Sequence, residues 1–173
     1  QVHTAGGSLH ATARTGSIEL RAGAAVDVSA AGGADAGSVA LLAPQGRVQL
    51  AGRLIGTTEQ GIGGELAIDS REAVDLTALG RLLARENDAG HANFTESIGV
   101  RNRSGGQTLS ADAVLVARRI AISADAGAID LLGELRAEGE RGAGIMVAAG
   151  ADLTLHPGAQ VLARNLADGV DGG

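Results

Sequence analysis

Ser38-Val39-Ala40-Leu41-Leu42-Ala43 is a stretch in which large apolar side chains alternate with other residues, and Gly144-Ile145-Met146-Val147-Ala148 repeats the pattern much later in the chain. Alternation with a period of two places the two sets of side chains on opposite faces of a β-strand. Each stretch is followed by further short alternating segments separated by Gly-containing turns. Such self-similarity predicts a solenoid, in which each repeat packs on its neighbours.

Six segments align on a leading apolar residue, spaced on average about 27 residues apart. These six anchors are Leu9, Val39, Leu66, Ile98, Ile120 and Ile145. Three short strands fit into each unit; in the third unit they start near Leu66, Val74 and Leu82. The pattern predicts an all-β fold, a right-handed parallel β-helix of about six coils with three short strands per coil.

The competing fold is an antiparallel β-sandwich, whose strands would be joined by Asn-Gly or Asp-Gly hairpins. Neither dipeptide joins two of the predicted strands. The repeat is already under way where the sequence starts, so residues 1–173 are expected to form a single β-helix segment of a longer chain. The alternation weakens over residues 84–106, where we expect an irregular excursion that contains a loop or a short helix.

The composition favours a narrow aliphatic core and excludes several classes of protein. Phe94 is the sole aromatic residue, yet 45% of the chain is hydrophobic, which excludes a disordered low-complexity chain despite 28 glycines. The absence of Cys excludes disulfides, thiolate metal sites and Cys nucleophiles. The net charge is −6 without a long basic run, so no nucleic-acid partner is predicted. No apolar stretch is long enough for a transmembrane helix.

Residues 37–52 (GSVALLAPQGRVQLAG) and 150–161 (GADLTLHPGAQV) resemble the degenerate repeats of the filamentous haemagglutinin family, the large exoproteins exported by two-partner secretion. The resemblance covers nearly the whole chain and implies a secreted or surface-exposed adhesive rod of a Gram-negative bacterium. It also implies an outer-membrane secretion partner and a host-cell, glycan or bacterial surface as the target. The chain lacks the Asn-Pro motifs of that family's secretion domain, which places it in the internal passenger.

The alternative function is that of a carbohydrate-active β-helix enzyme, a polysaccharide lyase or hydrolase. Glycoside hydrolysis requires two carboxyl groups on one wall. Two clusters of charged residues supply candidates, and they comprise Asp69, Arg71, Glu72 and Asp75 in one and Asp125, Asp130 and Glu134 in the other. Sugar-binding walls usually carry aromatic side chains, and this chain has only Phe94, so we expect no catalytic residues and no enzyme activity.

Specific contacts are expected where the repeat weakens. The candidate contact region comprises Arg85, Glu86, Asn87, Asp88, His91 and Phe94. Phe94 is expected either to pack beneath the irregular segment or to face a partner, and burial of a large apolar side chain favours packing.

The four histidines, with His10 on an outward strand position, predict no metal site, and no cofactor is expected. Unpaired strands at both ends of the solenoid predict end-to-end stacking of copies.

Overall fold

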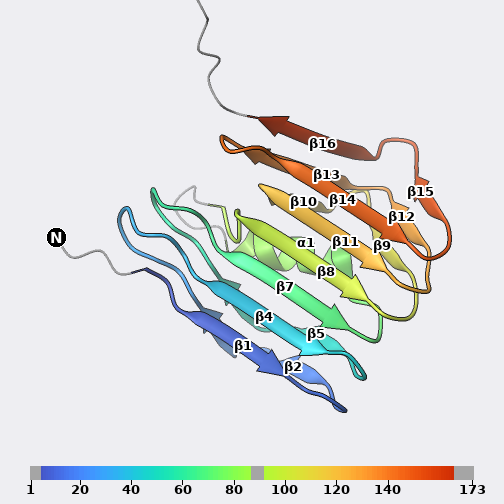
Figure 1. Ribbon diagram of the computed structural model, residues 1–173, viewed down its shortest axis with the longest axis horizontal. Helices are drawn as coiled ribbons and strands as arrows, with labels where there is room; N and C mark the ends of the chain where they lie inside the picture. Colours follow the sequence, from blue (N-terminus) through green and yellow to red (C-terminus); the bar gives the residue numbers. More distant parts are fainter. Residues whose placement is uncertain (1–4, 87–91, 166–173) are drawn as a thin grey trace, which may run out of the picture.

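The computed structural model describes residues 5–86 and 92–165 as a parallel β-solenoid of about six turns (Figure 1). One face, which we call wall 1, is a continuous sheet in the order β1-β4-β7-β8-β11-β14. Its strands are β1 (Ser8–Thr12), β4 (Ser38–Ala43), β7 (Glu65–Ser70), β8 (Ser97–Asn102), β11 (Arg119–Ala124) and β14 (Gly144–Ala149). The chain crosses this wall once in every coil, so wall 1 contains one strand from each of the six coils.

The other two faces, wall 2 and wall 3, are each interrupted once. Wall 2 consists of the pair β2-β5 and the sheet β9-β12-β15, with bounds β2 (Ile18–Leu20), β5 (Val48–Leu50), β9 (Gln107–Leu109), β12 (Ile129–Leu131) and β15 (Leu153–Leu155). Wall 3 consists of β3-β6 and β10-β13-β16, with bounds β3 (Ala25–Asp27), β6 (Arg53–Ile55), β10 (Val114–Ala117), β13 (Glu134–Gly139) and β16 (Gln160–Asn165). Both interruptions fall in the third coil.

The register of wall 1 confirms the sequence alignment at all six anchors. Leu9 pairs with Val39, and Val39 pairs with Leu66. The ladder then continues from Leu66 through three isoleucines, namely Ile98, Ile120 and Ile145. Because a slip of one residue would turn every apolar side chain outward, this register is the one that buries the alternating set. The predicted parallel β-helix with three strands per coil is therefore confirmed in five of the six coils.

The inward side chains form one aliphatic core that runs the length of the solenoid. Two buried polar residues, Ser70 and Asn102, are register partners at the corner where wall 1 turns into wall 2. Ser70 Oγ accepts a hydrogen bond from the Val48 amide at 3.2 Å, and Asn102 Oδ1 accepts one from the Val74 amide at 3.1 Å. These side chains satisfy backbone donors that the turn would otherwise leave buried without a partner.

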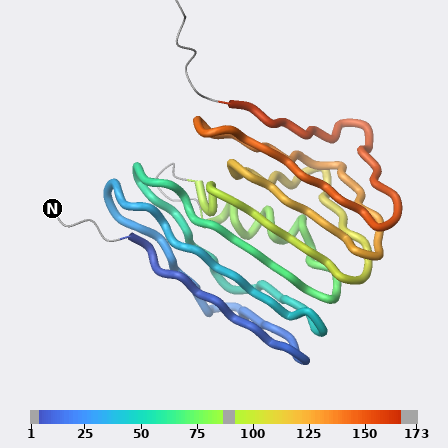
Figure 2. Tube along the Cα trace, in the orientation of Figure 1, coloured from blue at the N-terminus to red at the C-terminus, as the bar shows by residue number. Residues whose placement is uncertain are grey.

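The third coil departs from the prediction, because a helix stands where two strands were expected. The helix α1 (Leu76–Arg85) replaces the predicted strands near Val74 and Leu82 and contacts β6, β9 and β10. In Figure 2 the helical turns lie behind wall 1, between the blue-green coils and the yellow-orange coils. Among residues 5–86 and 92–165, no helix is long and apolar enough to cross a membrane.

Local sequence explains why a helix forms at this point. The side chain of Asp75 accepts a hydrogen bond from the Ala78 amide at 2.8 Å, which caps the first turn. Leucines three or four residues apart then place one apolar stripe on the core, and they are Leu76, Leu79, Leu82 and Leu83. Gly80 lets the helix lie directly against β10, because a Cβ at this position would meet the Val114 carbonyl oxygen at 2.9 Å.

The chain returns to wall 1 through Asn93 and Phe94, which are both buried. The departure from three strands per coil starts at α1, ahead of the predicted range 84–106, and it ends before β8. Strands β8, β9 and β10 then follow the regular pattern, with parallel partners in the next coil. The irregular coil is therefore the third, and the fourth coil is regular.

Candidate functional site

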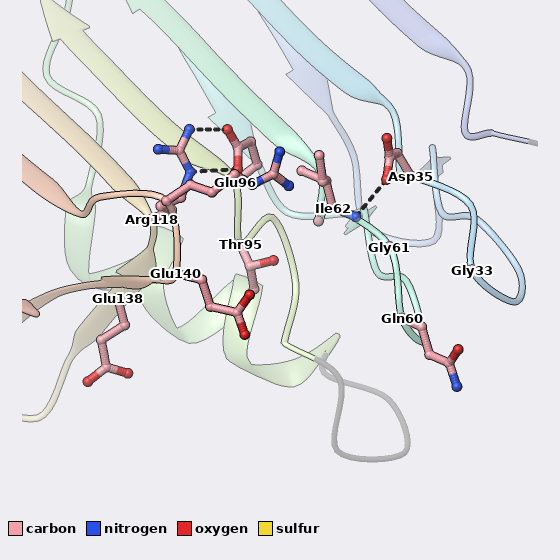
Figure 3. A pocket seen from close by; sticks show the side chains of 13 residues that line it. Gly33, Asp35, Gln60, Gly61, Ile62, Thr95, Glu96, Arg118, Glu138 and Glu140 are labelled. Carbon is pink, nitrogen blue, oxygen red and sulfur yellow. Dashed lines mark hydrogen bonds and ion pairs between the residues drawn. The ribbon is translucent and has the colours of Figure 1, made fainter. Parts of the chain in front are cut away.

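A groove of about 550 Å³ runs along the corner where wall 3 turns into wall 1 (Figure 3). We call it the corner groove. Each of the first five coils contributes residues from its closing segment. These are Gly33 and Asp35 after β3, Gln60 to Gly63 after β6, Thr95 and Glu96 before β8, Arg118 between β10 and β11, and residues 138–141 at the end of β13. The solenoid thus aligns closing segments that are far apart in sequence.

One side of the corner groove is held by contacts between consecutive coils. Asp35 Oδ1 accepts a hydrogen bond from the Ile62 amide at 2.8 Å. Thr58 Oγ1 donates to the Ala34 carbonyl at 2.7 Å and accepts from the Gly61 amide at 3.1 Å. These hydrogen bonds tie the closing segment of the first coil to that of the second. The Gly-rich turns therefore form an ordered side of the groove.

The opposite side is built on an ion pair between Glu96 and Arg118. Arg118 Nε donates to Glu96 Oε2 at 2.9 Å, a second guanidinium nitrogen bonds the other carboxylate oxygen, and Nη1 donates to the Gly142 carbonyl at 2.9 Å. Arg119 adds a bond to Glu96 at 3.1 Å. The hydrogen bond from Arg118 lowers the pKa of Glu96, and the same bond raises the pKa of Arg118.

Four charged or amide side chains in the corner groove are left available for a ligand. In the described part of the chain, Gln60, Glu138, Glu140 and Arg141 make no side-chain hydrogen bond or ion pair. Figure 3 shows Glu138 and Glu140 on the side of the Glu96–Arg118 pair and Gln60 on the opposite side, next to Gly61. A surface with carboxylates, an amide and exposed Gly-rich backbone can accept and donate several hydrogen bonds. Among the described residues no group of three potential ligands could hold a metal ion.

The predicted contact region is only partly described by the structure. Asn87, Asp88 and His91 fall outside the described residues. Arg85 is exposed at the end of α1, whereas Glu86 accepts a hydrogen bond from Arg53 Nε at 2.8 Å. Phe94 is fully buried, so the packing interpretation is confirmed and the idea that Phe94 contacts a partner is wrong.

The first predicted carboxylate cluster is divided among structural roles. Asp69 forms a two-point ion pair with Arg103, with both distances 2.7 Å. Asp75 caps α1. Both carboxylates are therefore used within the fold, whereas Glu72 of the same cluster is exposed.

The second predicted cluster is divided in the same way. Asp125 pairs with Arg101 at 2.7 Å, and Glu134 pairs with Arg136 at 2.6 Å. Asp130 lies 2.8 Å from His156 Nε2, which gives this histidine a partner one coil away. His10 is exposed on β1, as expected for an outward strand position.

Sequence reasoning missed the corner groove, because its residues were interpreted as turns that close each coil. The available signal was the alignment itself, since Asp35, Gln60, Glu96 and Arg118 all fall shortly before an anchor of wall 1. In comparisons with known proteins, no family model, no curated protein and no solved structure matches the chain.

Proposed function

We propose that this chain is a rod segment of a secreted or surface-exposed bacterial exoprotein, where it mediates attachment or display. The observation that carries the proposal is the corner groove. Among the described residues, several of its polar side chains have no partner, whereas others are hydrogen-bonded or ion-paired within the fold. A ligand could be bound there without a change in the fold, because the groove walls are already tied by Asp35 and by the Glu96–Arg118 pair. The expected target is a host-cell or bacterial surface, including its glycans.

The rod form supports this role through its geometry. Each coil adds about 4.8 Å of length through backbone pairing, so stiffness and reach need no aromatic core. Outward side chains of such a scaffold can vary while the inward aliphatic rows stay fixed. For the full-length protein, export through an outer-membrane partner remains part of the proposal that rests on the sequence resemblance.

The experiment is a binding measurement on a glycan array and on cultured cells. A double variant, Glu138→Gln with Glu140→Gln, removes the two available carboxylates and keeps side-chain size. We expect a loss of binding of at least about tenfold, as for two lost charge-assisted hydrogen bonds. Glu72→Gln is the matched control, because Glu72 is exposed and does not line the groove. Absence of any ligand for the unmodified chain would contradict attachment and leave display alone.

A carbohydrate-active enzyme is the second candidate, and one observation favours it. Four carboxylates line one groove, those of Asp35, Glu96, Glu138 and Glu140, and Asp35 is held by the Ile62 amide. A general acid in glycoside hydrolysis needs a raised pKa, whereas Arg118 lowers the pKa of Glu96, which leaves Glu138 and Glu140 as the candidates. Incubation with a panel of polysaccharides, followed by detection of new reducing ends, distinguishes the two functions. Product formation that disappears in the double variant would establish the enzyme.

A further inference from the structure

The corner groove lies between closing segments of unequal length. Those of the first, second and fifth coils are long, and they comprise residues 28–37, 56–64 and 140–143. The fourth coil closes through Arg118 alone. In Figure 3 the loops of Gly33 and Gln60 stand on one side of the groove. Glu138 and Glu140 stand on the other side, so the long segments bound the groove at both ends.

The spacing of the coils sets the length of a ligand that contacts both sides. Such a ligand reaches from the second coil to the fifth, which is three coil spacings or on the order of 14 Å. A single sugar ring is shorter than this distance. The groove therefore favours an oligomer that lies along the solenoid axis, across successive coils.

The lining of the groove carries a net negative charge. Four carboxylates face two guanidinium groups, which gives a net charge of −2. Glu96 is neutralised by its two-point ion pair with Arg118. The charged groups without an ion-pair partner in the described part of the chain are Asp35, Glu138, Glu140 and Arg141. Negative charge is therefore in excess among the groups that a ligand can meet, so the groove attracts cations and repels anions.

The free carboxylates suit several cationic groups on one molecule better than a single metal ion. Among residues 5–86 and 92–165, no three potential ligands converge on a metal site. Glu138 at the end of β13 and Glu140 two residues later project to the same side in Figure 3, as alternate residues of an extended segment do. Arg136, two residues before Glu138, is already paired with Glu134 at 2.6 Å. The two free carboxylates thus form a short row along the rim.

The groove offers more to a sugar chain than to a peptide. Strands β7, β8 and β11, which start beside the groove, are paired with neighbours on both sides, so a peptide finds no strand edge to extend. Ile62 is the one aliphatic side chain among the described lining residues. Sugar hydroxyl groups, in contrast, can bond to the Gln60 amide and to carboxylate oxygens.

We propose that the corner groove binds an oligosaccharide of amino sugars whose amino groups are free and protonated. The ammonium groups lie against Glu138 and Glu140, and hydroxyl groups bond to Gln60. This inference rests on the proposed attachment function and narrows its target to cationic glycans. Glycans that carry sulfate or carboxylate groups are disfavoured by the same charges.

The first experiment compares three oligosaccharides of equal length by isothermal titration calorimetry at about pH 6, where amino groups are protonated. The probes are oligomers of glucosamine, of N-acetylglucosamine and of a sulfated sugar. N-acetylation removes the positive charge and keeps the sugar chain. The glucosamine oligomer is expected to bind at least about tenfold more tightly than the N-acetylated one. Its affinity should fall with added salt, and the sulfated oligomer should bind most weakly.

The second experiment reverses the sign of the effect with two kinds of variant. Glu138→Gln with Glu140→Gln is expected to weaken binding of the glucosamine oligomer at least about tenfold. Arg141→Gln removes a repelling charge and is expected to tighten binding about twofold to fivefold. The matched control for the double variant is Glu72→Gln with Asp152→Asn. It makes the same change in net charge at two exposed positions outside the groove and should alter affinity by less than about twofold.

Several outcomes would overturn the inference without touching the proposed attachment. Equal affinity for the charged and the N-acetylated oligomer would do so, as would tighter binding of the sulfated oligomer. Weaker binding by Arg141→Gln would assign an anionic ligand to the groove. Oligolysine that binds as tightly as the glucosamine oligomer would show that charge alone is recognised, not an amino sugar. Failure of the unmodified chain to bind any glycan or any cell would instead contradict attachment itself.

Discussion

The side-chain amide of Asn93 stands beside Leu54 where a neighbouring strand is missing. Asn93 Nδ2 donates to the Leu54 carbonyl at 2.6 Å, and Asn93 Oδ1 accepts from the Gly56 amide at 2.6 Å. Because α1 interrupts wall 3, the edge of β6 has no parallel strand on that side. One primary amide supplies both the donor and the acceptor that a strand would have supplied.

Replacement of this amide is therefore expected to destabilise the protein strongly. Asn93→Ala leaves a buried carbonyl and a buried amide of the β6 edge without partners, and each such group costs about 1–3 kcal/mol. We expect the free energy of unfolding, measured with a chemical denaturant, to fall by about 2–5 kcal/mol. Gln60→Ala is the control, since Gln60 is exposed and should change stability by less than about 0.5 kcal/mol. Equal effects of the two substitutions would contradict the role assigned to Asn93.

The ring of Phe94 packs directly against the backbone of Gly56. The space beside Gly56 has room for this ring but not for an additional side chain on Gly56. A Cβ at Gly56 would come within 2.8 Å of the ring, and Phe94 adopts a φ of 50°, which is unusual for a bulky residue. Phe94→Ala is expected to cost about 3–5 kcal/mol through the cavity it leaves. Gly56→Ala alone is also expected to destabilise, because the ring has to move away from the new methyl group.

The double variant provides the test of this relationship. Without the ring, the methyl group of Gly56→Ala has room, so the double variant should be more stable than the sum of the two single effects predicts. Thermal or denaturant unfolding of all four proteins gives the coupling energy. A coupling energy near zero would mean that the ring and Gly56 are not in contact.

The solenoid could be predicted from the sequence because the same pattern, burial of alternating apolar side chains, recurs in nearly every coil. Every coil must bury alternating side chains, so the anchors from Leu9 to Ile145 identify the register without knowledge of the turns. The same rule failed in the third coil, where Val74 and Leu82 were assigned to strands. Leucines at intervals of three and four from Leu76, preceded by the capping Asp75, were the signal for a helix.

The corner groove could not be predicted in the same way. Its residues come one to four at a time from five coils, and each short segment by itself has the composition of a turn. Glu96 and Arg118 meet because they occupy equivalent corners of successive coils, which becomes evident only after the register is known. The predicted contact region followed the sequence irregularity, whereas the groove forms where the closing segments of five successive coils align, that of the irregular third coil included.

The Glu96–Arg118 pair predicts a pH dependence of stability. Both side chains are mostly shielded, with exposed fractions of 14% for Glu96 and 19% for Arg118. Since the folded state lowers the pKa of Glu96 below its ordinary value, the pair stabilises the fold fully above that ordinary value. The stabilisation is lost as the pH falls through the folded-state pKa. Arg118→Met should therefore lower the free energy of unfolding measured at pH 7, with a smaller difference in acid.

The control for this prediction is another ion pair on the same fold. Arg81 and Asp112 also form a close pair, but their side chains are 59% and 63% exposed. Arg81→Met should change the free energy of unfolding by less than about 1 kcal/mol at either pH. A difference between the Arg118→Met variant and the unmodified chain that grows in acid would contradict the assigned direction.

Gln107 places a polar amide in a row of apolar side chains. It is buried, its register partner is Ile129, and Ile129 in turn pairs with Leu153. In the described part of the chain, neither Nε2 nor Oε1 of Gln107 has a hydrogen-bond partner, and a buried polar group without a partner destabilises a fold. Gln107→Leu is therefore expected to raise the free energy of unfolding by about 1–3 kcal/mol in chemical denaturation.

The matched control is Gln49→Leu on β5, which makes the same change at an outward, exposed position. That variant should leave stability within about 0.5 kcal/mol of the unmodified chain. If Gln107→Leu instead destabilises by more than 1 kcal/mol, on the order of one hydrogen bond, the amide must have a partner such as an internal water. A crystal structure of the unmodified protein would then locate that water beside the Gln107 amide.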